Sequence, residues 1–402
     1  MKIFVVNAGS STLKYQVIDM QDESLVCKGI CDRIGATDGS LGTITHKTPD
    51  GKKYEDERPM PTHAEAFESV VYALTKSDAK VMDSFDEITA IGHRIVQGGS
   101  IFDDSCLLTP KAIDDIEMLG ELAPLHNPAH VLAIRACIKT FGDKIPQVAV
   151  FDTSFHQTLE PRAYMYALPY EYYEKYGVRK YGAHGTSHKY VSDRAAVMEG
   201  KDKKDLKIVT CHLGSGCSIS AVKDGVCFDT SMGFTPLDGF MMGTRCGTMD
   251  PSVLTYIAKK ENLSPDDINN ICNKKSGTLG ISCLTNDNRD LVDAAEAGNE
   301  KAALALEMQR YQIVKFIGSY IAAMNGIDAL VFAGGIGENN PELRADICKN
   351  FEYLGVKIDD APNKIRGEEI KISTPDSKVN VYVIPTNEEL AIARDTVRII
   401  GK

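Results

Sequence analysis

The sequence lacks the features that mark several classes of protein. None of its 402 residues lies in an apolar run long enough to span a membrane, and the opening stretch MKIFVVNAGSS is too short an apolar run for a signal peptide. We therefore expect a cytoplasmic protein. Basic residues are not in excess either, because the formal net charge is -11. This charge argues against nucleic acid or a membrane as the main partner, although it allows a local basic pocket for a small anion.

Motifs of metal binding and of common nucleotide folds are missing as well. The eleven cysteines contain no CxxC pair, so neither a disulfide framework nor a structural zinc site is indicated, and we expect free, mostly buried thiols. No GxxxxGK(S/T) stretch occurs, and GGIGEN at Gly334–Asn339 has Asn340 where the third glycine of GxGxxG would stand. The sequence therefore indicates neither a P-loop nor a dinucleotide-binding fold.

What the sequence does contain is a repeated strand pattern. At 402 residues the chain exceeds the size of one ordinary hydrophobic core, so two domains are expected. Near the start the pattern predicts three strands and a turn of small residues: Lys2–Val6, Leu13–Asp19 and Ser24–Ile30, with the turn at Gly9–Thr12. The same order recurs with strands at Lys207–Cys211, Cys217–Val222 and Val226–Phe228, and the turn at His212–Gly216. This repeat indicates a duplicated architecture.

The two turns are candidate phosphate sites. Small residues leave backbone N–H groups and hydroxyls facing outward, which is how many proteins bind a phosphate. An ordinary hairpin is the alternative for the first turn taken alone. The second copy favours the phosphate interpretation, with a polyphosphate held between two lobes.

Charged side chains follow two apolar strands. Arg94 lies in GHRIVQGG after the strand Ile88–Ile91, and Asp152 follows the strand Val148–Phe151. Ligand-binding groups of α/β proteins gather at such strand ends, and a guanidinium can bind a carboxylate or phosphate through two hydrogen bonds. The alternatives are a structural arginine paired with an internal aspartate, and an aspartate that caps a helix. Arg245, beside glycines, is a second candidate anion binder.

Two further stretches carry candidate residues. His184 and His188 stand four residues apart in YGAHGTSH, but no glutamate occupies the base position of HExxH. We therefore do not favour a zinc site. We expect a turn in which His184 faces a ligand and stabilises developing charge. Near the other end, Thr386 and Glu389 are predicted to form a capping box for the last helix, which leaves Glu388 to point toward a metal-bound water.

Ten motifs resemble, in order and spacing, the acetate kinases of the acetate and sugar kinase, Hsp70 and actin superfamily. They span essentially the whole chain: NAGSSTLK, GHRIVQGG, APLHNP, VFDTSFHQT, YGAHGTSHKYV, CHLGSGCS, DTSMGFTPLDG, GTRCGTMDP, FAGGIGEN and IPTNEELAIARDT. The resemblance implies an α/β, two-lobed, duplicated actin-like ATPase (ribonuclease H-like) fold with the active site in the interdomain cleft. Residues 1–152 plus 389–402 would form the lobe with the first phosphate hairpin. Residues 153–388 would form the lobe with the second hairpin, the nucleoside site and the dimer surface.

The resemblance also implies the reaction. It predicts a phosphotransferase with a carboxyl group as acceptor, which reversibly transfers the γ-phosphoryl group of ATP to acetate and gives acetyl phosphate and ADP. ATP/ADP would be the co-substrate, Mg2+ or Mn2+ the cofactor, and the assembly a homodimer. Propionate or butyrate is the alternative acceptor.

Site residues follow from the resemblance by position. Arg94 and Arg245 would act on the carboxylate and the transferring phosphoryl group, with Asp152 supporting one arginine and the metal and His184 acting on the transition state. The metal would lie near Asn7 and Glu388. Phosphates would be held by Ser10, Thr12, Lys14, His212, Gly214, Ser215 and Gly216, and the nucleoside by Asp287, Asn288, Arg289, Gly335, Ile336 and Asn339. The pocket for the substrate's methyl group would be walled by Val96, Leu125 and Pro236, with Ala183 beside it.

Several positions depart from the family pattern. Thr12 keeps the hydroxyl of the usual serine, and Gln97, Ser215 and Thr248 stand where His, Asn and Asp are expected. Ala183 matters more, because an aromatic ring normally lies there against the substrate pocket. Its loss could enlarge the pocket for propionate or butyrate, but one methylene is worth only about 1–3 kcal/mol of discrimination, so acetate stays the first choice.

The expected mechanism is direct in-line transfer. A carboxylate is already a nucleophile at neutral pH, so positioning and charge stabilisation suffice and no general base is needed. A sugar kinase of the same superfamily would need an aspartate as base, for which Asp152 is the only candidate, and it would not explain the paired arginines. A nucleotide switch, such as a chaperone ATPase lobe, would need a peptide-binding domain for which no residues remain.

Overall fold

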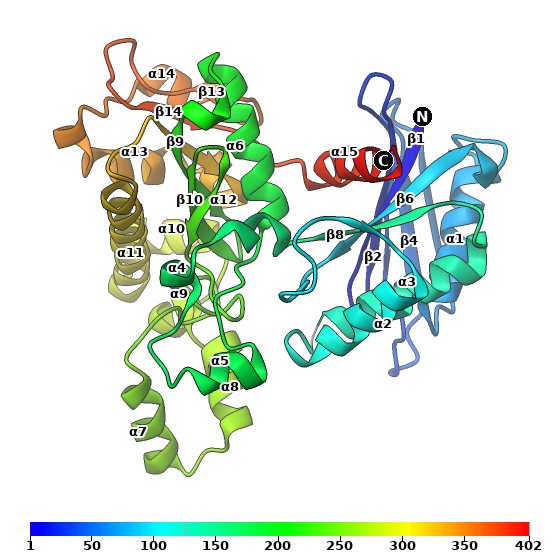
Figure 1. Ribbon diagram of the computed structural model, residues 1–402, viewed down its shortest axis with the longest axis horizontal. Helices are drawn as coiled ribbons and strands as arrows, with labels where there is room; N and C mark the ends of the chain where they lie inside the picture. Colours follow the sequence, from blue (N-terminus) through cyan, green and yellow to red (C-terminus); the bar gives the residue numbers. More distant parts are fainter. Residues whose placement is uncertain (125, 402) are drawn as a thin grey trace. The chain divides into compact units, whose positions relative to one another are not determined.

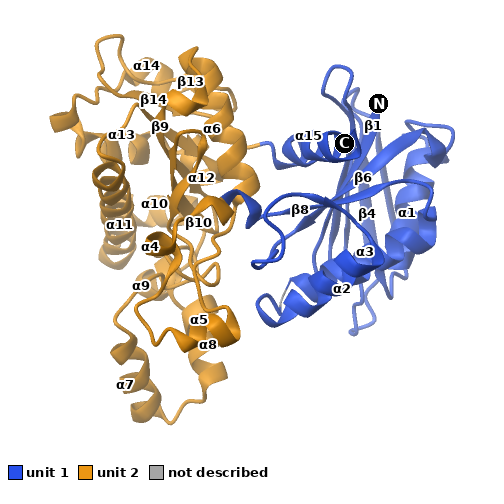
Figure 2. Cartoon of the chain, in the orientation of Figure 1, with its two compact units in different colours: residues 1–155, 387–402 blue, residues 156–386 orange. Residues whose placement is uncertain are grey.

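The computed structural model describes residues 1–124 and 126–401. The chain divides into two compact units: unit 1 contains Met1–Phe155 and Asn387–Lys402, and unit 2 contains His156–Thr386 (Figure 2). Each unit has a β-sheet with helices around it, so the fold is α/β as predicted (Figure 1).

Unit 1 is built on an eight-stranded sheet, within the described residues, in the order β5-β4-β3-β2-β1-β6-β8-β7. The strands are β1 (Lys2–Ala8), β2 (Leu13–Asp19), β3 (Ser24–Asp32), β4 (Gly42–Lys47), β5 (Lys53–Arg58), β6 (Ile88–Ile95), β7 (Cys106–Leu107) and β8 (Gln147–Phe151). β1, β6 and β8 are mutually parallel. Their carboxyl ends therefore meet at one edge of the sheet, where polar residues can share a ligand.

Helices cover both faces of this sheet (Figure 1). They are α1 (His63–Thr75), α2 (Pro110–Met118), α3 (Asn127–Phe141) and α15 (Glu388–Ile400), with short 3-10 turns η1 (Phe85–Glu87) and η2 (Leu119–Glu121). The core joins β1, β2 and β3 to α1 and α3, with Phe4 and Phe67 fully buried. On α15, Thr396 packs so close to β6 that a Cβ at Gly92 would clash with its Oγ1. The end of the chain is thus fixed against the strand that carries Arg94.

Unit 2 repeats the central strand order of unit 1. Its sheet runs β11-β10-β9-β12-β14-β13, and the first five of these match β3-β2-β1-β6-β8 strand for strand. The strands are β9 (Lys207–Leu213), β10 (Cys217–Lys223), β11 (Val226–Thr230), β12 (Ala329–Ala333), β13 (Ile370–Lys371) and β14 (Asn380–Val383). In both units an antiparallel hairpin lies beside a parallel strand, and β1 and β9 share one burial pattern. The predicted repeat is confirmed.

Helix α11 (Glu300–Met324) anchors the core of unit 2. Its Ile313 and Ile317 are buried with Ile219 of β10 and Phe332 of β12. The other helices are α4 (Pro161–Tyr164), α5 (Glu171–Tyr176), α6 (Gly185–Glu199), α7 (Pro251–Glu261), α8 (Pro265–Lys274), α9 (Gly277–Ser282), α10 (Asn288–Glu296), α12 (Gly334–Asn339), α13 (Pro341–Lys349) and α14 (Asp360–Asn363), and the 3-10 turns are η3 (Ser154–Thr158), η4 (Lys203–Asp205) and η5 (Glu352–Leu354).

The predicted capping box at Thr386 and Glu389 is wrong. The N-cap of α15 is Asn387, whose side chain accepts a hydrogen bond from the backbone N–H of Leu390 at 3.1 Å. Thr386 Oγ1 instead lies 2.7 Å from Ser187 Oγ. Asparagine caps helices at least as well as threonine, so the adjacent Asn387 takes the cap and the threonine hydroxyl serves another contact.

The cysteines are free thiols, and most are buried, as predicted; Cys283 is exposed. Across residues 1–124 and 126–401, no helix combines the length and the apolar character that crossing a membrane requires. In the same part of the chain, no group of three or more His, Cys, Asp and Glu side chains is arranged to hold a metal ion on its own.

Candidate active site

The first turn joins β1 to β2, and one hydrogen bond within the turn and one from helix α1 hold it in place. The N–H of Gly9 donates to the carbonyl of Thr12 at 2.8 Å, which closes the turn. The carbonyl of Gly9 accepts a hydrogen bond from Nε2 of His63, the first residue of α1, at 2.9 Å. Burial lowers the pKa of His63, so the ring serves as a neutral donor. With Gly9 fixed, Ser10 and Ser11 lie exposed at the turn, as a phosphate-binding turn of small residues requires.

Arg94 lies at the edge where the three parallel strands of unit 1 end. Its Nη2 is 2.6 Å from Oδ2 of Asp152 and its Nε is 3.2 Å from Oδ1, a bidentate ion pair between the ends of β6 and β8. Its Nη1 donates to Oδ1 of Asn7 on β1 at 3.4 Å, and its Nε is 3.8 Å from Oε2 of Glu388 on α15. The structure therefore brings together four of the residues singled out from the sequence.

This ion pair removes one alternative for Asp152, and it is the structural pairing that the sequence also allows for Arg94. The residue is not a helix cap, because both carboxylate oxygens face the Arg94 guanidinium. The Asp152 carboxylate, followed by Glu388, raises the pKa of Arg94, which stays cationic. Burial raises the pKa of Asp152 while the charge of Arg94 opposes that rise. Arg94 is thus held in one orientation before any ligand binds.

Two oxygen-bearing side chains next to Arg94 have the chemistry of magnesium ligands. Asn7 offers an amide oxygen and Glu388 a carboxylate, and both contact the same guanidinium. Mg2+ is usually bound through one or two carboxylates together with substrate phosphates and water. The donors present fit such a partial site, and Lys14, which pairs with Asn7 in the β1–β2 register, adds a cation beside the turn.

The second turn, in unit 2, joins β9 to β10. The N–H of Gly214 donates to the carbonyl of Gly216 at 3.2 Å, and Ser215 is exposed at the tip. A Cβ added at Gly216 would lie 3.3 Å from Nη1 of Arg245 and 3.5 Å from Nε2 of His184. The arginine and the histidine therefore converge on this turn, and only a glycine leaves them full room.

His184 is held in an unusual backbone conformation. It is the N-cap of α6 with φ of 57°, in the left-handed region that residues with side chains seldom adopt. Its Nδ1 is 2.8 Å from Oγ of Ser218 on β10, and its ring centroid is 4.4 Å from that of His212 on β9. The strained position and the hydrogen bond together direct Nε2 toward Gly216.

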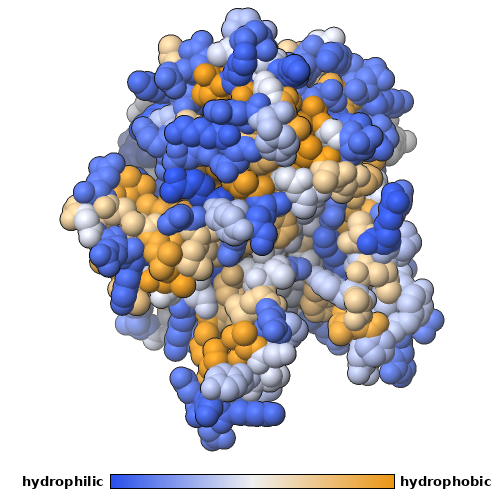
Figure 3. Space-filling model, turned by 90° about the vertical axis from the view of Figure 1, so that its left-hand side faces the viewer, coloured by the Kyte–Doolittle hydropathy of each residue, from blue (hydrophilic) through white to orange (hydrophobic). Residues whose placement is uncertain are grey.

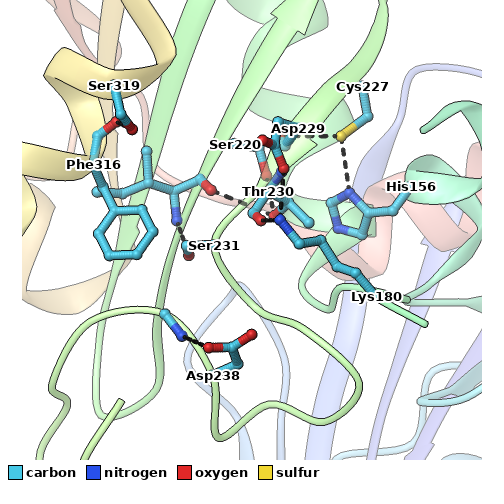
Figure 4. Close-up of polar contacts among 12 residues, drawn as sticks. His156, Lys180, Ser220, Cys227, Asp229, Thr230, Ser231, Asp238, Phe316 and Ser319 are labelled. Atoms are coloured by element: carbon cyan, nitrogen blue, oxygen red, sulfur yellow. Dashed lines mark hydrogen bonds and ion pairs between the residues drawn. The ribbon is translucent and has the colours of Figure 1, made fainter. Parts of the chain in front are cut away.

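The segment before His184 is anchored by a buried histidine of unit 2. His156 Nε2 donates to the carbonyl of Ala183 at 2.9 Å. Its Nδ1 lies 3.1 Å from Sγ of Cys227, the contact drawn in Figure 4. Burial lowers the pKa of His156 to about 4, so the ring is neutral and Cys227 is the donor to Nδ1. Lys180, drawn beside it, pairs with Asp229 at 2.7 Å. These contacts fix the turn that places His184.

Arg245 differs from Arg94 in its partners. Its Nη1 donates to the carbonyl of Pro236 at 3.2 Å and lies 3.7 Å from Sδ of Met242. Among the described residues no carboxylate forms an ion pair with it. Burial lowers its pKa below the ordinary arginine value, which is the sign of a cation that has lost water without gaining a counter-charge. Such a guanidinium is ready to bind an anion.

The residues predicted for the nucleoside surround one cavity of unit 2. Its volume is about 760 Å³, which lies within the range of about 300–1,000 Å³ that small-molecule sites usually have. From the predicted set it is lined by Gly214, Ser215, Asp287, Asn288, Arg289, Gly335, Ile336 and Asn339. Asp287 is also the N-cap of α10, and its carboxylate pairs with Arg289 at 2.7 Å.

Four other residues of this cavity have no signal in the sequence. Val292, Asp293, Glu342 and Arg366 also line it, and they come from two helices and a loop with no common motif. His63 and Ser218 were missed as well. Ser218 could have been found, because Thr210, His212, Ser218 and Ser220 alternate along two strands and mark a polar face in a buried sheet.

Of the residues predicted to surround the substrate's methyl group, the structure describes Val96, Ala183 and Pro236. Val96 is buried just after β6 in unit 1, and Leu125 lies outside the described residues. In unit 2, Ala183 is buried within the core cluster, and Pro236 offers its carbonyl to Arg245.

Comparison with known proteins gives the family. Residues 2–394 match the Acetokinase family. An acetate kinase of Methanosarcina mazei is 56% identical over 98% of this chain and 96% of the relative. The crystal structure of Porphyromonas gingivalis acetate kinase matches with a TM-score of 0.95 at 44% identity, covering 99% of each chain. A propionate kinase from Francisella tularensis matches with a TM-score of 0.90 at 41% identity, also over 99% of each chain. Because family, relatives and structures all match nearly end to end, the chain belongs to the acetokinase family.

Proposed function

We propose that this chain is a phosphotransferase that moves the γ-phosphoryl group of ATP to acetate and gives acetyl phosphate and ADP, reversibly. The observation that carries the proposal is the match to the acetokinase family over residues 2–394. The 56% identity to an acetate kinase over 98% of the chain supports acetate as the acceptor.

The acceptor carboxylate binds the two guanidinium groups. Arg245, half-buried and without a carboxylate partner among the described residues, takes a substrate anion, and Arg94 holds a second position fixed by Asp152. An acetate oxygen then attacks the γ-phosphorus in line while the bond to the β,γ-bridging oxygen breaks. The carboxylate needs no base, so catalysis is positioning together with stabilisation of negative charge on the transferring group.

His184 donates a hydrogen bond to the transferring phosphoryl group. Its Nε2 and the Nη1 of Arg245 both face Gly216, which supports a shared target at the second turn. Donors aimed at developing charge stabilise a transition state more than a ground state.

Both turns hold the phosphates of ATP. Ser10, Thr12 and Lys14 serve at the first turn, and His212, Gly214, Ser215 and Gly216 at the second, while the 760 Å³ cavity takes the nucleoside. Mg2+ would be held by Asn7 and Glu388 and would neutralise charge on the β- and γ-phosphates. Mn2+ has the same ligand chemistry and could replace it.

Propionate or butyrate is the second candidate acceptor. It is favoured by Ala183, which puts a methyl group where the family pattern has an aromatic ring, and by the similarity to a propionate kinase. We keep acetate first, because one methylene changes discrimination by only about 1–3 kcal/mol.

We further propose a cytoplasmic homodimer that associates through unit 2. Several large hydrophobic side chains of this unit are more than half exposed, including Leu168 (55%), Tyr170 (62%), Tyr176 (65%) and Tyr256 (63%). Figure 3 shows hydrophobic areas among hydrophilic ones on one face of the molecule. Exposed hydrophobic side chains that gather in a contiguous patch often mark protein interfaces.

The test is acyl phosphate trapping. Protein, Mg-ATP and either acetate, propionate or butyrate are incubated with hydroxylamine, which converts an acyl phosphate to a hydroxamate. We expect hydroxamate with acetate at the highest rate. A higher kcat/KM with propionate or butyrate than with acetate would make that acid the acceptor in place of acetate. If no acid gave hydroxamate, the proposed function would be overturned.

A further inference from the structure

A chain of buried hydroxyls and imidazoles lies behind His184 in unit 2. His188 is fully buried on α6, one helical turn after His184. Its Nδ1 is 2.7 Å from Oγ1 of Thr210, and its Nε2 is 2.7 Å from Oγ of Ser218. The same Ser218 oxygen is 2.8 Å from Nδ1 of His184. One hydroxyl thus joins the two imidazole rings.

The sequence places these groups together through two periodicities. Thr210 lies opposite Ser220 in the β9–β10 register and Ser218 lies two residues before Ser220, so their side chains share one face of the sheet. His184 and His188 are four residues apart at the start of α6 and share one face of that helix. The helix packs on β9, which buries the polar face of the sheet against the polar face of the helix.

The number of N–H and O–H hydrogens restricts the directions that the hydrogen bonds among these hydroxyls and imidazoles can take. Complete burial keeps His188 neutral by lowering its pKa, so one ring nitrogen carries a hydrogen and the other is a bare acceptor. If Nδ1 carried the hydrogen, it would donate to Thr210, whose own hydroxyl hydrogen would have the Ser220 carbonyl 3.4 Å away. That distance is poor for an O–H donor.

The opposite arrangement gives each hydrogen a short contact. Thr210 O–H donates to Nδ1 of His188, Nε2–H of His188 donates to Ser218, and Ser218 O–H donates to Nδ1 of His184, at 2.7, 2.7 and 2.8 Å. Because a buried hydroxyl without a partner is costly, this direction is the stable one. Nδ1 of His184 is then an acceptor, and the hydrogen of that ring is on Nε2.

We propose that Ser218 and His188 are positioning residues that hold His184 as the neutral Nε2–H tautomer. His184 then presents a hydrogen-bond donor toward Gly216 and Arg245 without being an imidazolium. The inference rests on the proposed function in one respect, that the group receiving this hydrogen bond is the transferring phosphoryl.

Nitrogen NMR of the wild-type protein with labelled histidine side chains tests the tautomers directly. Ring-nitrogen shifts separate protonated from bare nitrogens, and the spectra of His184→Gln and His188→Gln assign the two rings. We expect both rings to carry hydrogen on Nε2 and none on Nδ1. Hydrogen on Nδ1 of either ring would overturn the proposal. The ligand-free protein is used, so this result stands apart from whether acyl phosphate is formed.

A matched pair of variants tests the consequence for catalysis. Ser220 is two residues from Ser218 on β10 and equally buried, but its hydroxyl contacts Thr230 at 2.8 Å (Figure 4). We expect Ser218→Ala to lower kcat at least about tenfold, the value of one buried hydrogen bond, with KM values for ATP and acetate nearly unchanged. Ser220→Ala should keep kcat within about twofold, and Ser218→Thr, which keeps the hydroxyl, should recover most of it. Equal losses in the two alanine variants would contradict the positioning role.

Discussion

The two arginines of the candidate site lie in corresponding halves of a duplicated fold but are held differently. In unit 1, Arg94 makes a bidentate ion pair with buried Asp152 and reaches Asn7 and Glu388. In unit 2, Arg245 contacts the carbonyl of Pro236, and no carboxylate in the described part of the chain pairs with it. Arg94 has a counter-charge within the protein, whereas the described residues supply none to Arg245.

Two copies of one fold can therefore surround similar turns with different chemical groups. Each unit offers a small-residue turn after its first strand, but the polar structure near the turn differs. In unit 1 it is an ion pair among the ends of parallel strands, whereas in unit 2 it is a set of imidazoles and hydroxyls around His184. In unit 1 the ion pair fixes the position of the Arg94 charge. In unit 2 the hydroxyls and imidazoles fix the direction of the hydrogen bond that His184 donates.

The largest expected effect is on the rate of phosphoryl transfer. Arg94→Ala and Arg245→Ala should each lower kcat by about 10³-fold or more, because an arginine on a transferring phosphoryl group is worth roughly that much. The measurement is acetate-dependent hydroxamate formation at saturating Mg-ATP. As a control, Arg135→Ala removes an exposed arginine of unit 1 that pairs with Glu117. A variant at Arg94 or Arg245 that keeps wild-type kcat would remove that residue from the mechanism.

Stability should separate the same two variants. Arg94→Ala leaves Asp152 buried without its counter-charge, and breaking a buried pair in this way costs about 3–5 kcal/mol of unfolding free energy. Arg245→Ala removes no ion pair, and Arg135→Ala removes a surface pair worth at most about 1 kcal/mol. Urea unfolding of the three variants measures the comparison. Equal destabilisation by Arg94→Ala and Arg245→Ala would show that the contrast between the arginines is wrong.

Acid should destabilise both units through buried neutral histidines. Burial lowers the pKa of His93 in unit 1 and of His156 in unit 2 to about 4 each. Between about pH 6.5 and pH 4 the unfolded chain binds protons that the folded protein does not, so the unfolding free energy falls as the pH falls, by up to about 1.4 kcal/mol per pH unit for each group.

Histidine replacement checks this slope. In His93→Gln and in His156→Gln, the unfolding free energy measured by urea between pH 6.5 and pH 4 should depend less steeply on pH than in the wild-type protein, by about 1 kcal/mol per pH unit. A slope that is unchanged in one variant would mean that this histidine is already protonated in the folded state, or does not titrate in this range in either state.

The smallest expected effect concerns the cap of α15, which carries Glu388. Asn387→Ala removes the acceptor for the Leu390 N–H and should cost about 1 kcal/mol of unfolding free energy. Thr386→Ala removes only the contact with Ser187 and leaves the cap in place. Urea unfolding of both variants decides between the observed cap and the predicted one. A larger loss in Thr386→Ala would restore the capping box.

Much of the fold and part of the site could be predicted from the sequence. The strand-turn-strand repeat is visible because its spacing is local, and Arg94 and Asp152 are recognisable because charged residues directly after apolar strands meet at one sheet edge. The division into lobes at 152/153 and 388/389 and the individual residue roles stay predictions; the compact units divide at 155/156 and 386/387.

The rest could not be predicted because it depends on contacts between distant segments. His63 reaches Gly9 across 54 positions, and Ser218 reaches His184 across 34 positions. The alternating polar residues of β9 and β10 mark the face on which Ser218 lies, but neither a serine nor a histidine carries a local signal of its partner. The prediction of the α15 cap failed for another reason. Thr386 and Asn387 are neighbours and both have side chains that can cap a helix, and only the tertiary contact of Thr386 with Ser187 shows which one does so.

The most direct test of the central claim is the balance of products. Wild-type protein is incubated with Mg-ATP, acetate and hydroxylamine, and ADP and acetyl hydroxamate are measured together. We expect equal amounts of the two, with both lost in Arg245→Ala. ADP without hydroxamate, or neither product, would contradict phosphoryl transfer to the carboxylate.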